Sequence, residues 1–186
     1  RALYTNTTGS FNVAIGDSAL HNSSTTNNTV AVGYSALASL TTGGFNTAVG
    51  YLAGRAITSG PFNTVFGNSA AVSLSTGGYN TAIGYTANFN STIGNFNTGV
   101  GMYTNYYNTT QSNNTSVGYS AGDVYTFVNG TFVGASAYPN NSGYTNVGGF
   151  GYQATPTASN MIRIGNAAIT SINGAVNFTA VSDGRF

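Results

Sequence analysis

The sequence contains no cysteine, lysine, glutamate or tryptophan, and charged residues make up 4% of its 186 residues, against about a quarter in an ordinary soluble domain. The absence of cysteine excludes disulfide frameworks and thiol chemistry. Four arginines and three aspartates leave a net charge of +1, which provides no basic surface for nucleic acid. The sequence has no run of 18 apolar residues, so no membrane-spanning helix is predicted. We therefore expect neither nucleic-acid binding nor membrane insertion by this segment.

Glycine, in contrast, is abundant, with 26 residues, and ten of them recur at a nearly constant spacing. The ten are Gly16, Gly33, Gly50, Gly67, Gly84, Gly101, Gly118, Gly134, Gly151 and Gly165. Successive positions in this series differ by 17 six times, and then by 16, 17 and 14. An apolar residue precedes each of these glycines, and an alanine stands three residues after each, except at Thr104. A regular period of this length is typical of stacked structural repeats.

Each repeat predicts one short β-strand between glycine turns. Residues 45–49 and 79–83 are rich in β-branched and aromatic side chains and are flanked by glycine, as short strands are. A 17-residue unit of this kind is too small to fold alone and must stack on its neighbours. The sequence therefore predicts an all-β chain, a parallel β-solenoid of about ten 17-residue coils over residues 1–166.

Alternation along the strand predicts its two faces. Phe45, Thr47 and Val49 are the bulky set and are expected inside the roll, with the threonines of successive coils in line. Asn46 and Ala48 belong to a small, uncharged set, which is expected to pack against other copies of the chain about a threefold axis. A threonine ladder is also a feature of ice-binding solenoids, an alternative that the expected interior position disfavours.

The repeats resemble a known family. Residues 12–16, 46–51 and 80–85 are similar to the head repeat of trimeric autotransporter adhesins. The resemblance covers about residues 2–160 and implies a left-handed parallel β-roll, three copies of which form a collagen-binding or receptor-binding head. The repeat of that family is usually shorter, so the longer unit of this chain implies longer outer loops.

The C-terminal part resembles a different assembly. Residues 161–166, 169–174 and 181–186 are similar to a junction in phage tail fibres and tailspikes that precedes an endosialidase-type intramolecular chaperone. In that family the chaperone trimerises the fibre and is then released by cleavage at a Ser-Asp pair, which Ser182 and Asp183 match. The chaperone itself lies outside this chain, so this segment is not expected to perform such a cleavage.

The spacing of the last repeats predicts where the solenoid ends. The interval shortens at Gly165, and Val176, Phe178 and Ala180 then alternate without the repeat glycine. We therefore expect residues 167–186 to form a separate β neck, a β-prism-like junction in which Phe178 lies between subunits. Ala2 and Leu3 have the register of residues 19 and 20, so we expect the chain to be a piece of a longer fibre.

Catalysis, metals and cofactors are not expected. Glycosidase chemistry needs two carboxyl groups about 5–10 Å apart, whereas Asp17 and Asp123 stand six coils apart in the predicted solenoid. His21 is the single histidine, and it has no acid or nucleophile beside it in the sequence. With one histidine and no cysteine, a His/Cys metal site is excluded.

Candidate ligand-binding residues lie in coils six to nine, where the repeat becomes irregular. They are Tyr103, Tyr106, Tyr107, Tyr125, Tyr138 and Tyr144, which stand in loops rich in amide side chains. Aromatic faces with nearby hydrogen-bond donors suit sugars. The alternative is that these tyrosines pack on neighbouring coils or subunits.

These observations favour a homotrimeric, extracellular fibre segment, from a cell surface or a virion, that attaches to a receptor on a host or prey cell. A glycan is one candidate receptor, and three copies of a weak site would add avidity. The alternative is a purely structural shaft whose receptor-binding tip lies elsewhere.

Overall fold

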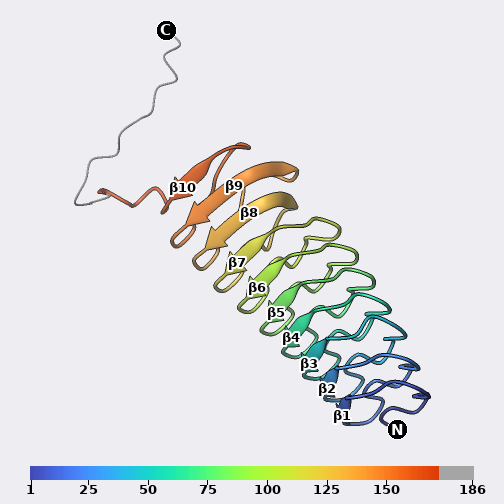
Figure 1. Ribbon diagram of the computed structural model, residues 1–186. Helices are drawn as coiled ribbons and strands as arrows, with labels where there is room; N and C mark the ends of the chain where they lie inside the picture. The colour runs from blue at the N-terminus through green and yellow to red at the C-terminus, as the bar shows by residue number, and fades with distance from the viewer. Residues whose placement is uncertain (172–186) are drawn as a thin grey trace.

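The chain winds into a single parallel β-solenoid. The structure is a computed structural model that describes residues 1–171, and in this part of the chain all regular secondary structure consists of ten strands in one sheet, with each strand next to its sequence neighbours. Figure 1 shows the coils stacked along one axis, with the two longest strands near the C-terminal end. The strands are β1 (Val13–Ile15), β2 (Val30–Val32), β3 (Thr47–Val49), β4 (Thr64–Phe66), β5 (Thr81–Ile83), β6 (Thr98–Val100), β7 (Thr115–Val117), β8 (Phe127–Val133), β9 (Tyr144–Phe150) and β10 (Ile162–Ile164). The predicted all-β parallel solenoid is confirmed.

The register of the sheet follows the glycine spacing. Val49 of β3 pairs with Phe66 of β4, and Phe66 pairs with Ile83 of β5, all in parallel. The step shortens by one position between β7 and β8, where Thr115 pairs with Thr131. It shortens further between β9 and β10, as the spacing of the last two repeat glycines predicts. The prediction that equivalent residues of successive repeats stack is therefore confirmed.

The repeat glycine is required because the coils approach closely where the strand ends. Gly50 has a φ of 140°, and a Cβ atom built on it would overlap the carbonyl oxygen of Gly67 in the next coil. Any side chain would clash there with backbone that cannot move without breaking the stack. The number of residues between successive repeat glycines therefore equals the number of residues in one coil.

The predicted assignment of the two strand faces is wrong. Ala48 and Asn46 are 0% and 1% exposed, whereas Phe45, expected inside the roll, is 55% exposed. Thr47 and Val49 are half-buried on the same outward side as Phe45. The small set therefore fills the interior of the coil, and the bulky set faces out. The prediction that the Ala48 face packs between subunits is wrong for the same reason.

The narrowness of the coil explains the inversion. Strand β3 packs directly against the opposite wall of its own coil, from which Leu37, Leu40 and Ile57 fill the interior at 0% exposure. Two walls this close leave room for alanine beside leucine but not for a second large residue, because protein interiors are close-packed. The bulky residues are outside because the interior is already full.

The coils are held together by an asparagine ladder as well as by the sheet. Asn63 is buried, and its Oδ1 accepts the backbone N–H of Asn80 at 2.9 Å. Its Nδ2 donates to the carbonyl oxygens of Gly60 at 3.2 Å and Gly77 at 3.0 Å. The same contact recurs one coil earlier, where Asn46 Oδ1 accepts the N–H of Asn63 at 2.8 Å. Each amide thus satisfies backbone groups that a narrow turn would otherwise bury unpaired.

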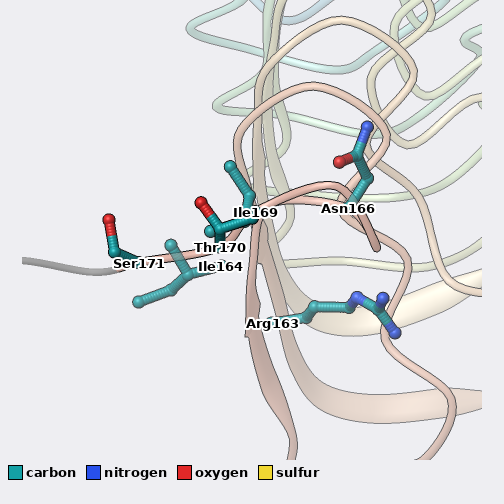
Figure 2. Close-up of a pocket in the computed structure, with 6 residues that line it drawn as sticks. All are labelled: Arg163, Ile164, Asn166, Ile169, Thr170 and Ser171. Carbon is teal, nitrogen blue, oxygen red and sulfur yellow. The ribbon is translucent and has the colours of Figure 1, made fainter.

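The interior changes character along the solenoid. The first coils hold an alanine and leucine core, whereas β8 and β9 enclose an aromatic core in which Phe127 and Phe132 meet edge to face at 4.7 Å. At β10 the interior column ends in Arg163, whose guanidinium donates to the carbonyl oxygens of Gly165 at 3.2 Å and Thr155 at 3.5 Å. Figure 2 shows Arg163 and Ile164 leaving the strand on opposite sides. The half-buried charge closes the apolar interior at this strand.

Of the expected neck, residues 167–186, the structure describes residues 167–171. Residues 167–171 are exposed and lie outside the strands. Phe178 and the Ser182–Asp183 pair lie outside the described residues, so the neck and the cleavage junction stay predictions. In the part of the chain that the structure describes, we find no helix with the length and apolarity needed to cross a membrane.

The asparagine ladder generates a stability prediction. Replacing Asn63 with alanine removes the partners of the Asn80 N–H and of the Gly77 carbonyl inside a buried turn. Because each unsatisfied buried group costs about 1–3 kcal/mol, we expect Asn63→Ala to lower the free energy of unfolding by about 3 kcal/mol. The measurement is chemical denaturation at one protein concentration.

Asn68→Ala is the matched control, because Asn68 is exposed and its side chain contacts only its neighbour Ser69 among the contacts seen in residues 1–171. It should change stability by less than about 0.5 kcal/mol. Equal effects of the two substitutions would contradict a structural role for the ladder.

Candidate functional site

The outward face of the sheet is the first candidate site. Each regular coil presents side chains there in the order of Phe45, Thr47 and Val49, and the register repeats these as three columns. Across the described coils the three columns contain no charged residue. Their apolar members remain exposed along the length of the solenoid, including Ile15, Phe66, Ile83, Val133 and Ile164. Uncharged, exposed apolar surface of this extent is typical of protein–protein interfaces.

Aromatic rings form a continuous stack along one margin of this face. The rings of Phe45, Phe62, Tyr79 and Phe96 lie 5.0 Å apart from coil to coil, with interplanar angles of 10–17°. All four side chains are about half exposed. We call these four residues the aromatic column. A stack this regular follows from the solenoid register, which places equivalent residues directly over one another.

The aromatic column occupies an unfavourable backbone conformation. Its four residues have φ values between 56° and 62°, in the left-handed region that bulky side chains rarely adopt. Asparagine tolerates this region, and it occupies the same position in other coils, as Asn28, Asn113 and Asn129. Aromatic residues therefore stand where the local backbone favours asparagine. Stacking recovers about 0.5–1.5 kcal/mol per pair, which offsets a strain of about 1–3 kcal/mol per residue only in part.

The second candidate site is a cluster of tyrosines in the turn after β6. Tyr103, Tyr106 and Tyr107 line one hollow together with Tyr119, Ser120 and Asp123, and its volume is about 310 Å³. We call these six residues the tyrosine cage. Three of the six predicted ligand-binding tyrosines are thus brought together.

The rings of the tyrosine cage stand at steep angles to one another. Tyr106 meets Tyr103 at 5.8 Å and 74°, and Tyr107 at 5.0 Å and 74°. Tyr103 also meets Tyr119 of the next coil at 6.3 Å and 76°. Phe89 stacks on one face of Tyr106 at 5.1 Å and 9°, which leaves the opposite face for the hollow. The walls of the hollow therefore face several directions, and no flat platform is formed.

Buried polar contacts hold the cage turn in place. Thr104 and Asn105, which lie between the cage tyrosines in sequence, are buried inside the coil. Asn105 Nδ2 donates to Asn88 Oδ1 at 3.1 Å, and Asn105 Oδ1 accepts from the hydroxyl of Ser116 at 2.6 Å. This amide cluster occupies positions that alanine and leucine fill in earlier coils, so the interior is specialised beneath the cage.

Asp123 is the charged member of the cage lining. It stands one full repeat after Tyr106, and its carbonyl oxygen accepts the backbone N–H of Tyr107 at 3.2 Å. Burial raises the pKa of the Asp123 carboxyl, and a side-chain hydrogen bond with Ser120 opposes that rise. Burial also raises the pKa of Tyr106, with smaller contributions from Tyr107 and Tyr103. A carboxylate held at a cost beside aromatic walls is typical of a functional site.

The other predicted tyrosines do not join the cage. The Tyr144 hydroxyl donates to the Thr157 carbonyl at 2.7 Å and lies 3.0 Å from Asn140 Oδ1, which ties two loops together. Tyr125 and Tyr138 are half-buried and do not line the hollow. For these three residues the structure agrees better with the packing alternative than with ligand binding.

Sequence reasoning missed Tyr119, Ser120 and Asp123 as members of the cage. The signal was available, because a 17-residue step from Tyr106 leads to Asp123 and the register places both on one side of the coil. Tyr103 also departs from the repeat, because small or aliphatic residues such as Ser69 and Leu52 hold its position elsewhere. Applying the register to the loops as well as to the strands would have found the cluster.

A further hollow of about 480 Å³, drawn in Figure 2, lies at the end of the described residues. Its one charged lining residue is Arg163, whose Nε and Nη1 atoms donate to backbone carbonyls. Among residues 1–171 the structure brings together no group of three or more histidine, cysteine or acidic side chains suited to a metal ion.

No protein-family model, no curated protein and no solved structure matches the chain.

The raised pKa of Asp123 generates a pH-dependent prediction. The Asp123 carboxyl binds its proton more tightly in the folded state than in the unfolded state. Its ionisation therefore costs no folding stability below the unfolded pKa, near 3.9. The loss of stability grows as the pH rises from that value through the folded pKa, and it is complete above the folded pKa. We therefore expect Asp123→Asn to melt a few degrees above wild type at pH 7 and together with it at pH 3.

The measurement is thermal denaturation followed by circular dichroism at both pH values and one protein concentration. Asp17→Asn is the control, because Asp17 is an exposed carboxyl that does not line the hollow. Its substitution should leave the melting temperature at pH 7 unchanged or lower. A stabilising effect of Asp123→Asn that persists at pH 3 would contradict the ionic cause.

Proposed function

We propose that this chain is a segment of a homotrimeric, extracellular attachment fibre, from a cell surface or a virion, that binds a receptor on another cell. The parallel β-solenoid supports the resemblance to trimeric adhesin heads, and we extend the proposal to left-handed winding of the coils. The observation that carries the proposal is the uncharged outward sheet face with its strained aromatic column. Its proposed occupant is a second and a third copy of the same chain.

The chemistry of the outward face supports self-association. Three copies placed about an axis parallel to the solenoid would bring identical columns together along the whole rod. Closed rotational symmetry satisfies every copy equally and leaves no unpaired face. Exposed residues such as Phe66 and Ile83 would then lose water contact between subunits. Each buried side chain of this size contributes about 1.5–3 kcal/mol.

Backbone strain supports the same assignment. Asparagine would relieve the left-handed strain at Phe62 and Tyr79, as it does at equivalent positions of other coils. Stacking within one chain offsets this strain only in part. Contact with a neighbouring copy would add a further contribution, because aromatic residues are enriched at the centres of interfaces.

The threonine column faces outward and not inward as expected, so ice binding has to be compared again with protein packing as the role of this face. An outward threonine ladder would suit ice binding if the face were flat. Here the threonines lie between the rings of Phe45 and Phe62 on one side and the side chains of Val49 and Phe66 on the other. Protruding rings of this kind favour packing against a complementary protein surface over contact with a flat crystal plane.

The tyrosine cage supports attachment and distinguishes the proposal from a purely structural shaft. A shaft needs stacking coils and an interface, but it needs no hollow lined by phenol groups and a carboxylate. Three copies of one weak site on a rigid trimer would increase the avidity for a repetitive cell surface by about 10²-fold or more.

The assembly is tested by the double variant Phe62→Asn/Tyr79→Asn. Because asparagine suits the local backbone, the coil should fold with an unchanged circular dichroism spectrum. The loss of two rings per chain from the interface should weaken the trimer by about 10²-fold or more in dissociation constant. Analytical ultracentrifugation measures the change directly, and thermal hysteresis on the same samples tests ice binding.

Ile93→Asn is the control, because Ile93 is also an exposed apolar residue but does not belong to the three columns of the face. It should leave the trimer intact. A monomeric wild type, or a double variant that assembles as well as wild type, would contradict the interface. Thermal hysteresis by the wild type would favour the ice-binding alternative.

Attachment is tested separately by binding of the labelled trimer to cells and to a glycan array. The double variant serves as the low-valency comparison, and its retention should be lower. A wild-type trimer that binds neither surface would favour the structural shaft.

A further inference from the structure

We infer that the tyrosine cage is a receptor site for an organic cation, a quaternary ammonium or alkylated amine group such as the choline head. This inference rests on the proposed function for the role of the cage in attachment, and it names the chemical class of the group that is recognised. It is carried by the arrangement of four phenol rings and one carboxylate around a single hollow.

The angles between the rings suit a cation. The π-face of an aromatic ring is electronegative, so a cation is stabilised when several faces surround it within about 6 Å of the ring centroids. Tyr106 stands nearly perpendicular to both Tyr103 and Tyr107, and Tyr103 stands nearly perpendicular to Tyr119. Rings oriented in this way line an open hollow with aromatic surfaces that face several directions. A methylated ammonium group, which is roughly spherical, fits such a surface better than a flat ligand does.

A stacked ring supports one wall of the hollow, and a carboxylate provides negative charge in its lining. Phe89 covers the far face of Tyr106 at 5.1 Å, so the ring cannot turn away from the hollow without losing that stack. Asp123 supplies the negative charge, and no arginine lines the hollow. An uncompensated carboxylate in a partly desolvated aromatic site would gain a counter-charge when the cation binds.

Other ligand classes fit this site less well. A sugar stacks on one open ring face, whereas the rings of this hollow stand at steep angles to one another and form no flat platform. A bare metal ion needs several oxygen ligands, and the lining provides one carboxylate. An anion would be repelled by Asp123. The aromatic walls and the single negative charge leave an organic cation as the best match.

At one of its positions the hollow is a local departure from the solenoid pattern. Where Tyr103 stands, other coils carry smaller residues such as Leu52 and Ser69. The position of Asp123 varies from coil to coil, with His21 and Arg55 among its members, and Asp123 is its one acidic residue in the described coils. The added ring and the carboxylate lie in adjacent coils and line the same hollow.

The test compares two ligands of the same shape. Choline and 3,3-dimethyl-1-butanol differ in that a quaternary carbon replaces the charged nitrogen. Isothermal titration of the wild-type protein should show choline binding at least about tenfold more tightly than the neutral isostere. Equal affinities, or no binding of choline, would overturn the inference.

Variants identify the groups responsible. We expect Tyr106→Leu to weaken choline binding by about tenfold or more, and Asp123→Asn to weaken it several-fold. Tyr103→Phe should bind choline nearly as well as wild type, because it keeps the ring and loses only the hydroxyl. If Tyr103→Phe abolished binding, hydrogen bonding through the phenol would replace the cation–π explanation, and the inference would fail.

Two controls keep the result interpretable. Tyr51→Leu removes an exposed tyrosine that stacks on Tyr34 outside the cage, and it should leave choline affinity unchanged. If Tyr106→Leu does not fold, as judged by circular dichroism, Tyr107→Leu replaces it, because Tyr107 is an exposed member of the cage. Wild-type affinity in the folded cage variant would overturn the inference.

Two surfaces can present this head group, and retention of the trimer distinguishes them. Phosphatidylcholine vesicles present it on a lipid, and a choline-substituted polysaccharide presents it on a glycan. Retention on either one, competed by free choline, supports the inference and identifies the source. If free choline binds but neither surface retains the trimer, the cation site stands and the proposed attachment role fails. A trimer that attaches to cells without competition by choline would leave the attachment role intact and would overturn the cation site.

Discussion

The narrowness of the coil is the constraint on which the rest of the structure depends. Two walls of backbone lie so close that the interior accepts alanine and asparagine from the strand and leucine from the opposite wall. The larger residues must face outward because no space remains for them. The exposed apolar face, the aromatic column and the proposed assembly all follow from this exclusion, and a wider roll of the same sequence would have none of them.

Strict stacking then turns each local feature into a column. One buried asparagine becomes a ladder of backbone hydrogen bonds, and one exposed ring becomes a continuous stack. The same rule gives meaning to departures from the pattern. Tyr103 stands where other coils carry smaller residues, and the register brings it to one hollow with Asp123 of the next coil. The regular register therefore forms the rod, and a local change of residues forms the candidate site on it.

Much of the fold could be predicted because the repeat period is marked by glycines, which the close contact between coils requires. The repeat glycine marks a backbone approach that excludes any Cβ atom, so its spacing predicted the coils, their parallel register and the shortened step to β10. Half of the candidate site was also predictable, since loop tyrosines in the irregular coils stood out. The remaining members were missed because Tyr119 and Asp123 become neighbours of Tyr106 only when the register is extended through the turns.

The sequence by itself determined the solenoid, its period and the scarcity of charge along it, because glycine spacing and residue counts are properties of the chain alone. Only the tertiary structure decided which strand face is buried. Alternation separates Phe45 and Val49 from Asn46 and Ala48, but it does not say which set is inside. That choice depends on the distance between the two walls and on what Leu37 and Leu40 already fill, and packing between residues far apart in the chain sets both.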